Sequence, residues 1–226
     1  MINNLQPLST IEHYKIHIPS DCCSVGDQLL VGSYPGNFDL KKHQQKIDEL
    51  CKAGVRIWIC LQPEEELKEL QPYQPFIKTW VSRQNHKDVD MKFIQLPIQQ
   101  PVSDTIIKKY IETIDLLLHE AQQKQILVYL HCKCGHASSG MITILLIAKR
   151  LKLTTTKALN IWNKLHENIG IRKKTSKKYK CKMSSEQLCV LKRFEYAFGG
   201  AAPLPTPSNN KRKIKDITTY MNKKAR

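Results

Sequence analysis

The sequence predicts an α/β fold of three layers, in which a central mixed sheet lies between helices and a basic C-terminal tail follows. Apolar segments of strand length alternate with segments whose apolar residues recur every three or four positions, as in strands separated by helices. One predicted strand ends at His131 and Cys132 and passes through a loop of small residues into a helix from about Ser139. Such a loop aims backbone N–H groups and the positive end of a helix dipole at one point, which favours an anion.

Four strands are predicted from short runs rich in apolar and β-branched residues. The first runs into a turn that contains Pro35 and Gly36, the second stops at Pro63, and the third has Pro97 near its end. The fourth is the strand that leads to Cys132, at the carboxyl edge where ligands of α/β sheets bind. The four strands are Leu29–Gly32, Val55–Leu61, Met91–Ile98 and Ile126–Leu130.

Helices are predicted between these strands and after the last one. Leu40–Ala53 has a helical pattern, and Gly54 stands where a glycine commonly ends a helix. Asp104–Gln122 has one apolar face, because its isoleucines and leucines keep helical spacing. Between Glu64 and Lys87 we predict only loop and short helix. Three more helices are predicted after the last strand. The first begins at about Ser139, and the second is capped by Thr154 or Thr155 and ends near Gly170. The third begins at the capping-box residues Ser184 and Gln187 and ends before Gly199 and Gly200.

The chain of 226 residues is long enough to bury a substantial core, and we expect one domain with two flanking segments. Residues 1–24 are expected to form an N-terminal extension, 25–198 the domain, and 199–226 a flexible linker and basic tail. No apolar run reaches the roughly 18 residues of a membrane span, and the first residues lack the pattern of a secretion signal. We therefore expect an intracellular protein, without contact to a membrane, whose eight cysteines are reduced.

Most of the net charge of +16 belongs to two segments. Arg172–Lys182, the basic segment, holds seven cations and no acid, and Lys211–Arg226 holds seven cations and one acid. Either one is a candidate to contact nucleic acid or an acidic protein. Within the tail, Ile217–Met221 weakly resembles a sliding-clamp-binding box, and a solvated tail without a specific role is the simpler alternative. The candidate nuclear localisation signal consists of Lys211, Arg212, Lys213, Lys223 and Lys224.

Residues 131–140, which read H-C-K-C-G-H-A-S-S-G, resemble the signature loop of the cysteine-dependent tyrosine and dual-specificity protein phosphatases. In that family His-Cys is followed by five residues, an arginine, a serine or threonine, and a glycine. The resemblance covers about residues 25–198 and is greatest to the small dual-specificity branch, which includes kinase-associated phosphatases. It implies a phosphatase-like fold and attack by a cysteine on phosphorus. Four further segments are similar to that branch: L-L-V-G-S-Y-P-G (29–36), G-V-R-I-W-I-C-L (54–61), F-I-Q-L-P-I (93–98) and S-S-E-Q (184–187).

The resemblance also implies roles for single residues. Cys132 stands at the position of the nucleophile, and Ser139 at the position of the hydroxyl that stabilises the departing thiolate. His131 stands at the position that helps to hold the surroundings of the cysteine. We call the segment around Cys132 the phosphate loop; its other residues are His131, Lys133, Cys134, Gly135, His136, Ala137, Ser138 and Gly140.

Two positions depart from the family pattern. Ser138 occupies the arginine position, and serine cannot reproduce the two-pronged, charged grip of a guanidinium on phosphate. Gln100 occupies the position of the general acid, and glutamine cannot deliver a proton to a leaving group. Asp104 is the nearest substitute acid, although it also fits as the cap of the helix that starts there, and Lys133 is the nearest substitute cation.

Other interpretations of the same loop remain open. His131, Cys132, Cys134 and His136 are potential metal ligands, but zinc sites usually draw on two separated ligand pairs, so we expect neither a metal nor another cofactor. Cys132 and Cys134 are candidates for a strained, reversible disulfide, and Cys132 alone for a small buried thiol.

Together these observations predict a pseudophosphatase, that is, a phosphatase fold with a degraded catalytic loop that binds or scaffolds a phosphoprotein in the nucleus. The alternative within the enzyme class is a slow dual-specificity phosphatase that uses Cys132 with Asp104 and Lys133 as substitutes. A third hypothesis is a basic accessory subunit of a complex associated with nucleic acid, which would bind in a salt-dependent way.

Overall fold

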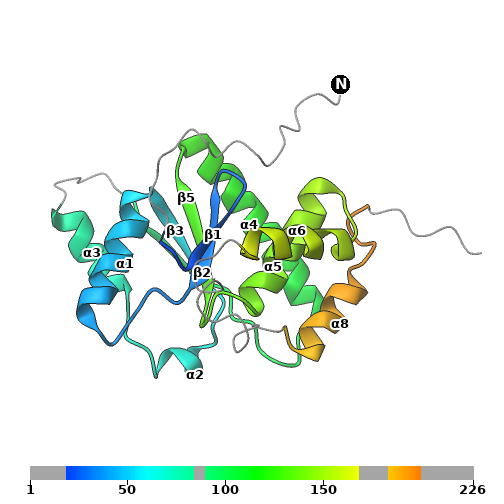
Figure 1. Ribbon diagram of the computed structural model, residues 1–226, viewed down its shortest axis with the longest axis horizontal. Helices are drawn as coiled ribbons and strands as arrows, with labels where there is room; N and C mark the ends of the chain where they lie inside the picture. The colour runs from blue at the N-terminus through cyan, green and yellow to red at the C-terminus, as the bar shows by residue number, and fades with distance from the viewer. Residues whose placement is uncertain (1–18, 84–89, 168–182, 200–226) are drawn as a thin grey trace, which may run out of the picture.

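The computed structural model describes residues 19–83, 90–167 and 183–199, and places them in a three-layer α/β fold (Figure 1). The basic segment, the nuclear-signal candidate and the clamp-box candidate lie outside these residues. The strands are β1 (Cys22–Val25), β2 (Leu29–Ser33), β3 (Val55–Cys60), β4 (Lys92–Gln95) and β5 (Leu127–Cys132). The helices are α1 (Leu40–Lys52), α2 (Glu64–Leu67), α3 (Gln74–Arg83), α4 (Asp104–Lys124), α5 (Ser138–Leu151), α6 (Thr155–Glu167) and α8 (Ser185–Arg193).

The five strands form one mixed sheet in the order β1-β2-β5-β3-β4. The pairs β2–β5, β5–β3 and β3–β4 are parallel, whereas β1 runs antiparallel to β2 at the edge. The predicted mixed sheet is therefore confirmed. Its central strand, β5, ends at Cys132, which pairs with Ser33 of β2, and His131 pairs with Cys60 of β3.

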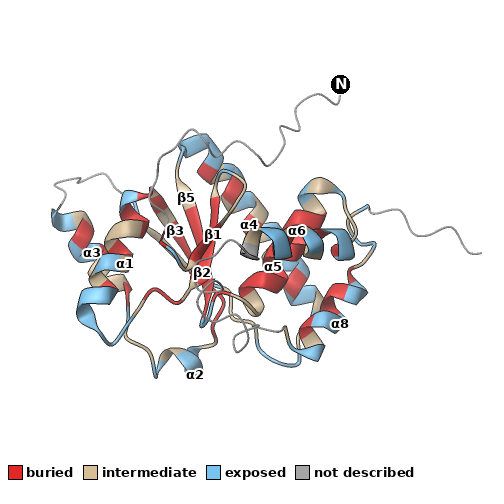
Figure 2. Ribbon diagram, viewed as in Figure 1, coloured by how far each residue is buried: buried red, intermediate tan, exposed pale blue. Residues whose placement is uncertain are grey.

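Helices cover both faces of the sheet, and the buried residues lie between the layers (Figures 1 and 2). Helices α1 and α3 cover one face, where Trp58, Tyr129 and Ile47 are buried in an aromatic-rich core. Helices α4, α5, α6 and α8 lie on the other side of the sheet, over a mainly aliphatic core that includes Leu130 and Ile142. Because β5 is buried on both faces, the position of Cys132 is fixed by both cores.

The capping signals predicted at Gly54, at Thr154 and at Ser184 with Gln187 are confirmed, whereas the cap predicted at Asp104 is wrong. Gly54 follows α1 with φ of +101°, a conformation that glycine adopts without steric cost. Thr154 accepts a hydrogen bond at Oγ1 from the backbone N–H of Lys157 at 3.3 Å, at the start of α6. Ser184 and Gln187 form the reciprocal capping box of α8. The cap of α4 is Ser103, so Asp104 is its first helical residue and not the cap.

The structure corrects two predictions. The domain begins before residue 25, because β1 occupies Cys22–Val25 and each of its residues pairs with β2. Four residues without alternation carry too weak a pattern to indicate an edge strand. The region after Glu64 contains the ten-residue helix α3 besides the short helix α2, and α3 buries Ile77 and Trp80 against the sheet. Among the described residues, no helix combines the length and apolarity that crossing a bilayer requires.

Candidate functional site

The site is built at the carboxyl end of β5, where Cys132 is the last residue of the strand. It is 6% exposed, and its Sγ lies 3.3 Å from the hydroxyl of Ser139, the second residue of the following helix α5. A hydroxyl at that distance can donate a hydrogen bond to a thiolate and stabilise it. The structure therefore brings together the two residues that the family resemblance assigned to nucleophile and thiolate stabiliser.

The phosphate loop rests directly on the end of β2. Gly135 has φ of +73°, and a Cβ atom there would lie 2.6 Å from the backbone N of Ser33, closer than real Cβ atoms come. The backbone N–H of Tyr34 donates to the carbonyl oxygen of Lys133 at 3.2 Å. Only glycine permits both the left-handed conformation and this approach, so Gly135 sets the curvature of the loop.

His131 holds the loop from beneath. Its ring is fully buried, and Nε2 is hydrogen-bonded to the hydroxyl of Tyr73 at 2.9 Å. The carbonyl oxygen of His131 accepts from the backbone N–H of Leu61 at 2.9 Å. Burial, with a smaller contribution from the charge of Lys46, lowers the pKa of His131 to about 3. The imidazole is therefore neutral near pH 7 and holds Cys132 in place without adding charge to the site.

Ser138, at the arginine position, is the first residue of α5 and is half-buried. Its hydroxyl accepts a long hydrogen bond of 3.4 Å from the side-chain amide of Gln187, the capping-box residue of α8. Gly140 completes the helix start by packing against Trp162, whose Nε1 a Cβ atom would approach to 3.2 Å. The loop thus keeps its fold, and the place of a charged clamp is taken by a short neutral side chain tied to α8.

The remaining loop side chains reach the surface. Lys133 and Cys134 are exposed, whereas Ala137 is half-buried. Partial burial raises the pKa of the Cys134 thiol, as do the nearby Cys132 and Glu66, against a smaller opposing effect of Lys133. In the described ranges no group of three or more histidine, cysteine or acidic residues is arranged to hold a metal ion.

The family position of the general acid, Gln100, lies between β4 and α4, and the substitute candidate, Asp104, is the first residue of α4. Gln100 is exposed. Asp104 forms a forked ion pair with Arg193 of α8, in which both carboxylate oxygens accept at 2.6 to 2.9 Å. Hydrogen bonding and charge from Arg193 lower the pKa of Asp104. This pairing argues against the general-acid role, because an ionised carboxylate held by an arginine has no proton to donate.

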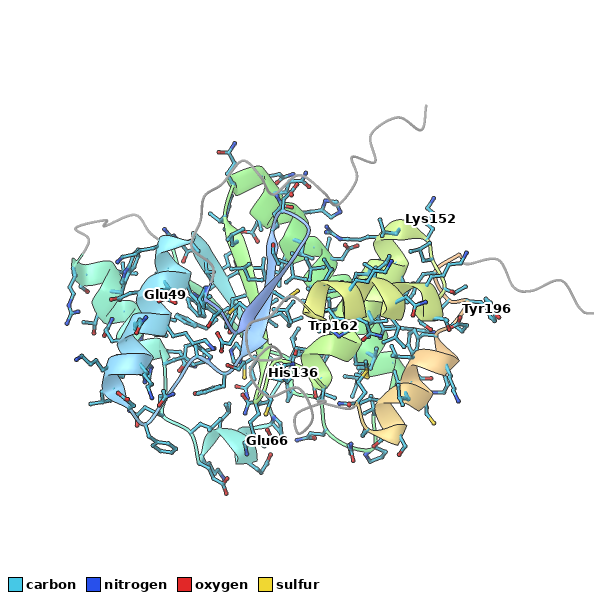
Figure 3. The ribbon with its side chains drawn as sticks, viewed as in Figure 1. Glu49, Glu66, His136, Lys152, Trp162 and Tyr196 are labelled. Carbon is cyan, nitrogen blue, oxygen red and sulfur yellow. The ribbon has the colours of Figure 1, made fainter. Side chains whose placement is uncertain are left out.

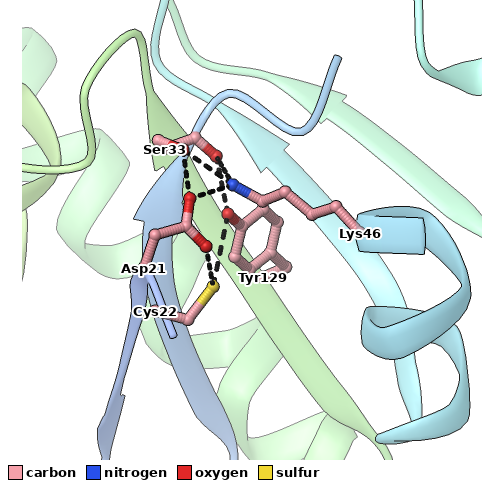
Figure 4. Close-up of polar contacts among 5 residues, drawn as sticks. All are labelled: Asp21, Cys22, Ser33, Lys46 and Tyr129. Carbon is pink, nitrogen blue, oxygen red and sulfur yellow. Dashed lines mark hydrogen bonds and ion pairs between the residues drawn. The ribbon is translucent and has the colours of Figure 1, made fainter. Parts of the chain in front are cut away.

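A network beneath the loop involves residues to which the sequence gave no role (Figure 4). Lys46 of α1 forms an ion pair with Asp21, and both are bonded to the hydroxyl of Ser33, with Nζ at 2.7 Å and Oδ2 at 2.6 Å. Tyr129 donates its hydroxyl to the carbonyl oxygen of Ser33 at 2.6 Å. The backbone of Ser33 supports the phosphate loop, so the network holds the residues beneath the site in place. No pattern links Asp21 to Lys46 in the sequence, because they are 25 residues apart.

The five-stranded sheet, the buried cysteine at the end of its central strand and the loop that starts a helix together define a cysteine-dependent phosphatase domain. The chain matches the family model described as "Swiss Army Knife protein, DSP-PTPase phosphatase domain" over residues 30–189, which shows that it belongs to this family. A separate comparison with curated proteins found no match.

Solved structures share the fold at low sequence identity. The crystal structure of PTPMT1 matches with a TM-score of 0.54 and 16% identity, over 89% of this chain and 99% of that chain. Human tyrosine phosphatase-like serine/threonine/tyrosine-interacting protein matches with a TM-score of 0.54 and 15% identity, over 80% and 99%. Human DUSP28 matches with a TM-score of 0.51 and 14% identity, over 80% and 96%. At these identities the likeness concerns the fold alone.

Proposed function

We propose that the protein is a pseudophosphatase, which binds a phosphorylated protein at the loop without hydrolysing the phosphate. The observation that carries the proposal is Ser138: it stands at the arginine position of a loop that otherwise keeps its buried cysteine and its glycine turn. Removing a single neutral oxyanion donor commonly costs about 10² to 10³ in rate, and the missing group here is a charged, bidentate one.

Binding a phosphate group requires fewer protein groups than hydrolysing it. The loop backbone and the N-terminus of the 14-residue helix α5 direct N–H groups and the helix dipole to the point above Cys132. Lys133 is exposed beside that point and can add one cation. A dianion would thus find donors and a favourable field, although not the clamp that stabilises a transition state.

We infer the kind of partner and the cellular location from sequence segments outside the described residues. A basic segment and a basic tail favour a phosphoprotein or another acidic partner, and the clusters near Lys211 and Lys223 favour the nucleus. Contact with nucleic acid or with a sliding clamp through the same segments stays a prediction.

A slow phosphatase is the second candidate, and the contact of 3.3 Å between Cys132 and Ser139 favours it. Such a contact would stabilise a thiolate that attacks or departs. The pairing of Asp104 with Arg193 speaks against it, because a leaving group would then lack a proton donor.

Calorimetric titration with phosphotyrosine peptides tests the proposed binding. The natural protein should bind them, and the unphosphorylated peptides at least tenfold more weakly. Ser138→Asp is the matched control, because aspartate suits the first turn of a helix but repels phosphate, and it should weaken phosphopeptide binding at least tenfold. Equal binding of phosphorylated and unphosphorylated peptides, or an unaffected Ser138→Asp variant, would refute phosphate recognition by the loop.

A further inference from the structure

A cavity of about 400 Å³ opens beside the phosphate loop, between β3, β4, α2 and α3. None of the residues of the phosphate loop lines it. Its floor is apolar and includes Tyr34, Tyr73, Phe93 and Leu67, and its rim carries Glu64 and Lys68. Cavities that bind ligands share this pattern of apolar walls with a few charged groups, and they start at about 300 Å³.

Three aromatic rings in the lining of the cavity pack against one another. The rings of Tyr34 and Tyr73 meet edge to face with centroids 5.3 Å apart, and the ring of Phe93 lies 6.4 Å from that of Tyr73. Tyr73 is 2% exposed and its hydroxyl is bonded to His131, which holds the ring in place. A preformed aromatic wall costs little ordering entropy when a side chain packs against it.

The helix beside the cavity, α2, is acidic. Glu64, Glu65 and Glu66 form its first turn, all three are exposed, and none forms a salt bridge with a described residue. Figure 3 shows Glu66 at the same end of the molecule as His136 of the loop. Burial raises the pKa of Cys60, which lines the cavity, and the Glu66 carboxylate adds a smaller contribution. Of the charged residues that the structure describes, only Glu64 and Lys68 line the cavity, and the neighbouring Glu65 and Glu66 leave α2 with an excess of negative charge, which favours a cationic segment along this helix.

We propose that this cavity is a docking site for a protein partner, which inserts one large aliphatic or aromatic side chain while neighbouring lysines or arginines lie along α2. The size of the cavity determines which side chain of the partner fits, and charge complementarity determines which residues of the partner lie next to it. The site goes beyond the proposed function and does not depend on it, because the cavity and the loop have no residue in common. A partner that uses both would present a basic, apolar motif next to its phosphorylated residue.

Fluorescence anisotropy with labelled nine-residue peptides tests the site. The probes are unphosphorylated peptides with a central leucine between arginines, the same peptide with glutamates in place of the arginines, and the arginine peptide with a central alanine. At low salt the basic leucine peptide should bind at least tenfold more tightly than either of the others. The acidic peptide binding as well as the basic one would overturn the proposed chemistry.

Three variants locate the binding. Leu67→Trp fills the cavity and should weaken binding of the basic leucine peptide at least tenfold. Glu64→Gln and Glu66→Gln should each weaken it about two- to fivefold, an effect that salt reduces. Glu112→Gln is the matched control, since Glu112 is an exposed glutamate on α4 in the opposite layer, and it should change nothing. Peptide binding that survives both Leu67→Trp and the glutamate variants overturns the proposal.

Two further comparisons separate this proposal from phosphate recognition by the loop. Ser138→Asp should leave binding of the unphosphorylated basic peptide unchanged, because the cavity does not include the loop. A Leu67→Trp protein that unfolds at the natural urea concentration is intact, so its loss of basic-peptide binding belongs to the cavity whether or not the natural protein binds phosphotyrosine. Loss of peptide binding in Ser138→Asp would contradict the independence of the two sites.

Discussion

Ser138 stands where the loop of the family carries an arginine. The two residues that follow it keep the contacts on which the loop depends: Ser139 contacts Cys132, and Gly140 lets α5 pack on Trp162. The hydroxyl of Ser138 is used internally by Gln187. An arginine there would have to break this contact with α8 to reach a phosphate.

Gly135 is the second residue on which the loop depends. Gly135→Ala should abolish phosphopeptide binding and lower the free energy of unfolding by more than the about 1 to 2 kcal/mol of left-handed strain alone, because its Cβ would meet the backbone of β2. Gly54→Ala is the matched control: its φ is +101° but no atom lies within 4 Å of a Cβ, so it should show strain only. Urea unfolding and calorimetry check both. Equal costs for the two variants would mean that the contact with β2 does not shape the loop.

At the scale of elements, β1, β2 and α1 are joined beneath the loop by Lys46, Asp21 and Ser33. Burial alone would raise the pKa of Asp21, but the charge and the hydrogen bonds of Lys46 and Ser33 outweigh it, so the pKa lies below its usual value. The native state therefore favours the ionised carboxylate. This contribution to stability is present above the unfolded pKa near 3.9 and is lost as the pH falls through the lower folded pKa.

Lys46→Met should reduce the free energy of unfolding by about 2 kcal/mol, because it leaves a largely buried carboxylate without its cation. Asp21→Asn in the same background should restore part of the loss, which gives a favourable coupling in a double-mutant cycle. The more exposed pair of Lys124 and Glu120 is the control and should show a smaller coupling. Urea unfolding of the natural protein and the variants of both cycles measures the two couplings, and an equal coupling for both pairs would mean that burial does not strengthen the Asp21 pair.

How much the sequence predicts depends on whether a signal is local. Neighbouring residues predict that α1 ends before Gly54, that α8 begins at Ser184 and that a strand stops at Cys132. The structure agrees with all three predictions. The partner of Asp104 is 89 residues away, and no periodicity indicates it. The cavity likewise combines residues of four elements, so it exists only once the sheet and α2 are assembled.

At the scale of the whole molecule, burial of histidine makes stability depend on pH. The folded pKa of His131 is about 3, against about 6.5 for an unfolded histidine, so the unfolded state binds more protons below pH 6.5. The free energy of unfolding should fall by about 2 kcal/mol between pH 7 and pH 5 from this residue alone. Burial lowers the pKa of His43 as well, which adds to the same trend.

Urea unfolding from pH 5 to pH 7.5 measures this slope, and the imidazole signals of His131 in an NMR titration identify its source. Those signals should not shift across this range. A titration of His131 near pH 6.5, or a stability independent of pH, would contradict the buried neutral imidazole on which the loop rests.

Charge is also distributed unevenly over the molecule. Most of the net positive charge of the sequence lies in segments outside the described residues, whereas α2 presents three carboxylates beside the site. A partner could bind the basic segments with its own acidic residues and α2 with its own basic residues.

We propose a phosphate loop that is complete in fold and lacks the group that drives turnover. Hydrolysis of p-nitrophenyl phosphate tests this proposal, because this leaving group needs no general acid. The natural protein should be indistinguishable from Cys132→Ser, whereas Ser138→Arg should hydrolyse the substrate at least tenfold faster, and Ser138→Arg combined with Cys132→Ser should not. Turnover by the natural protein that disappears in Cys132→Ser would contradict it.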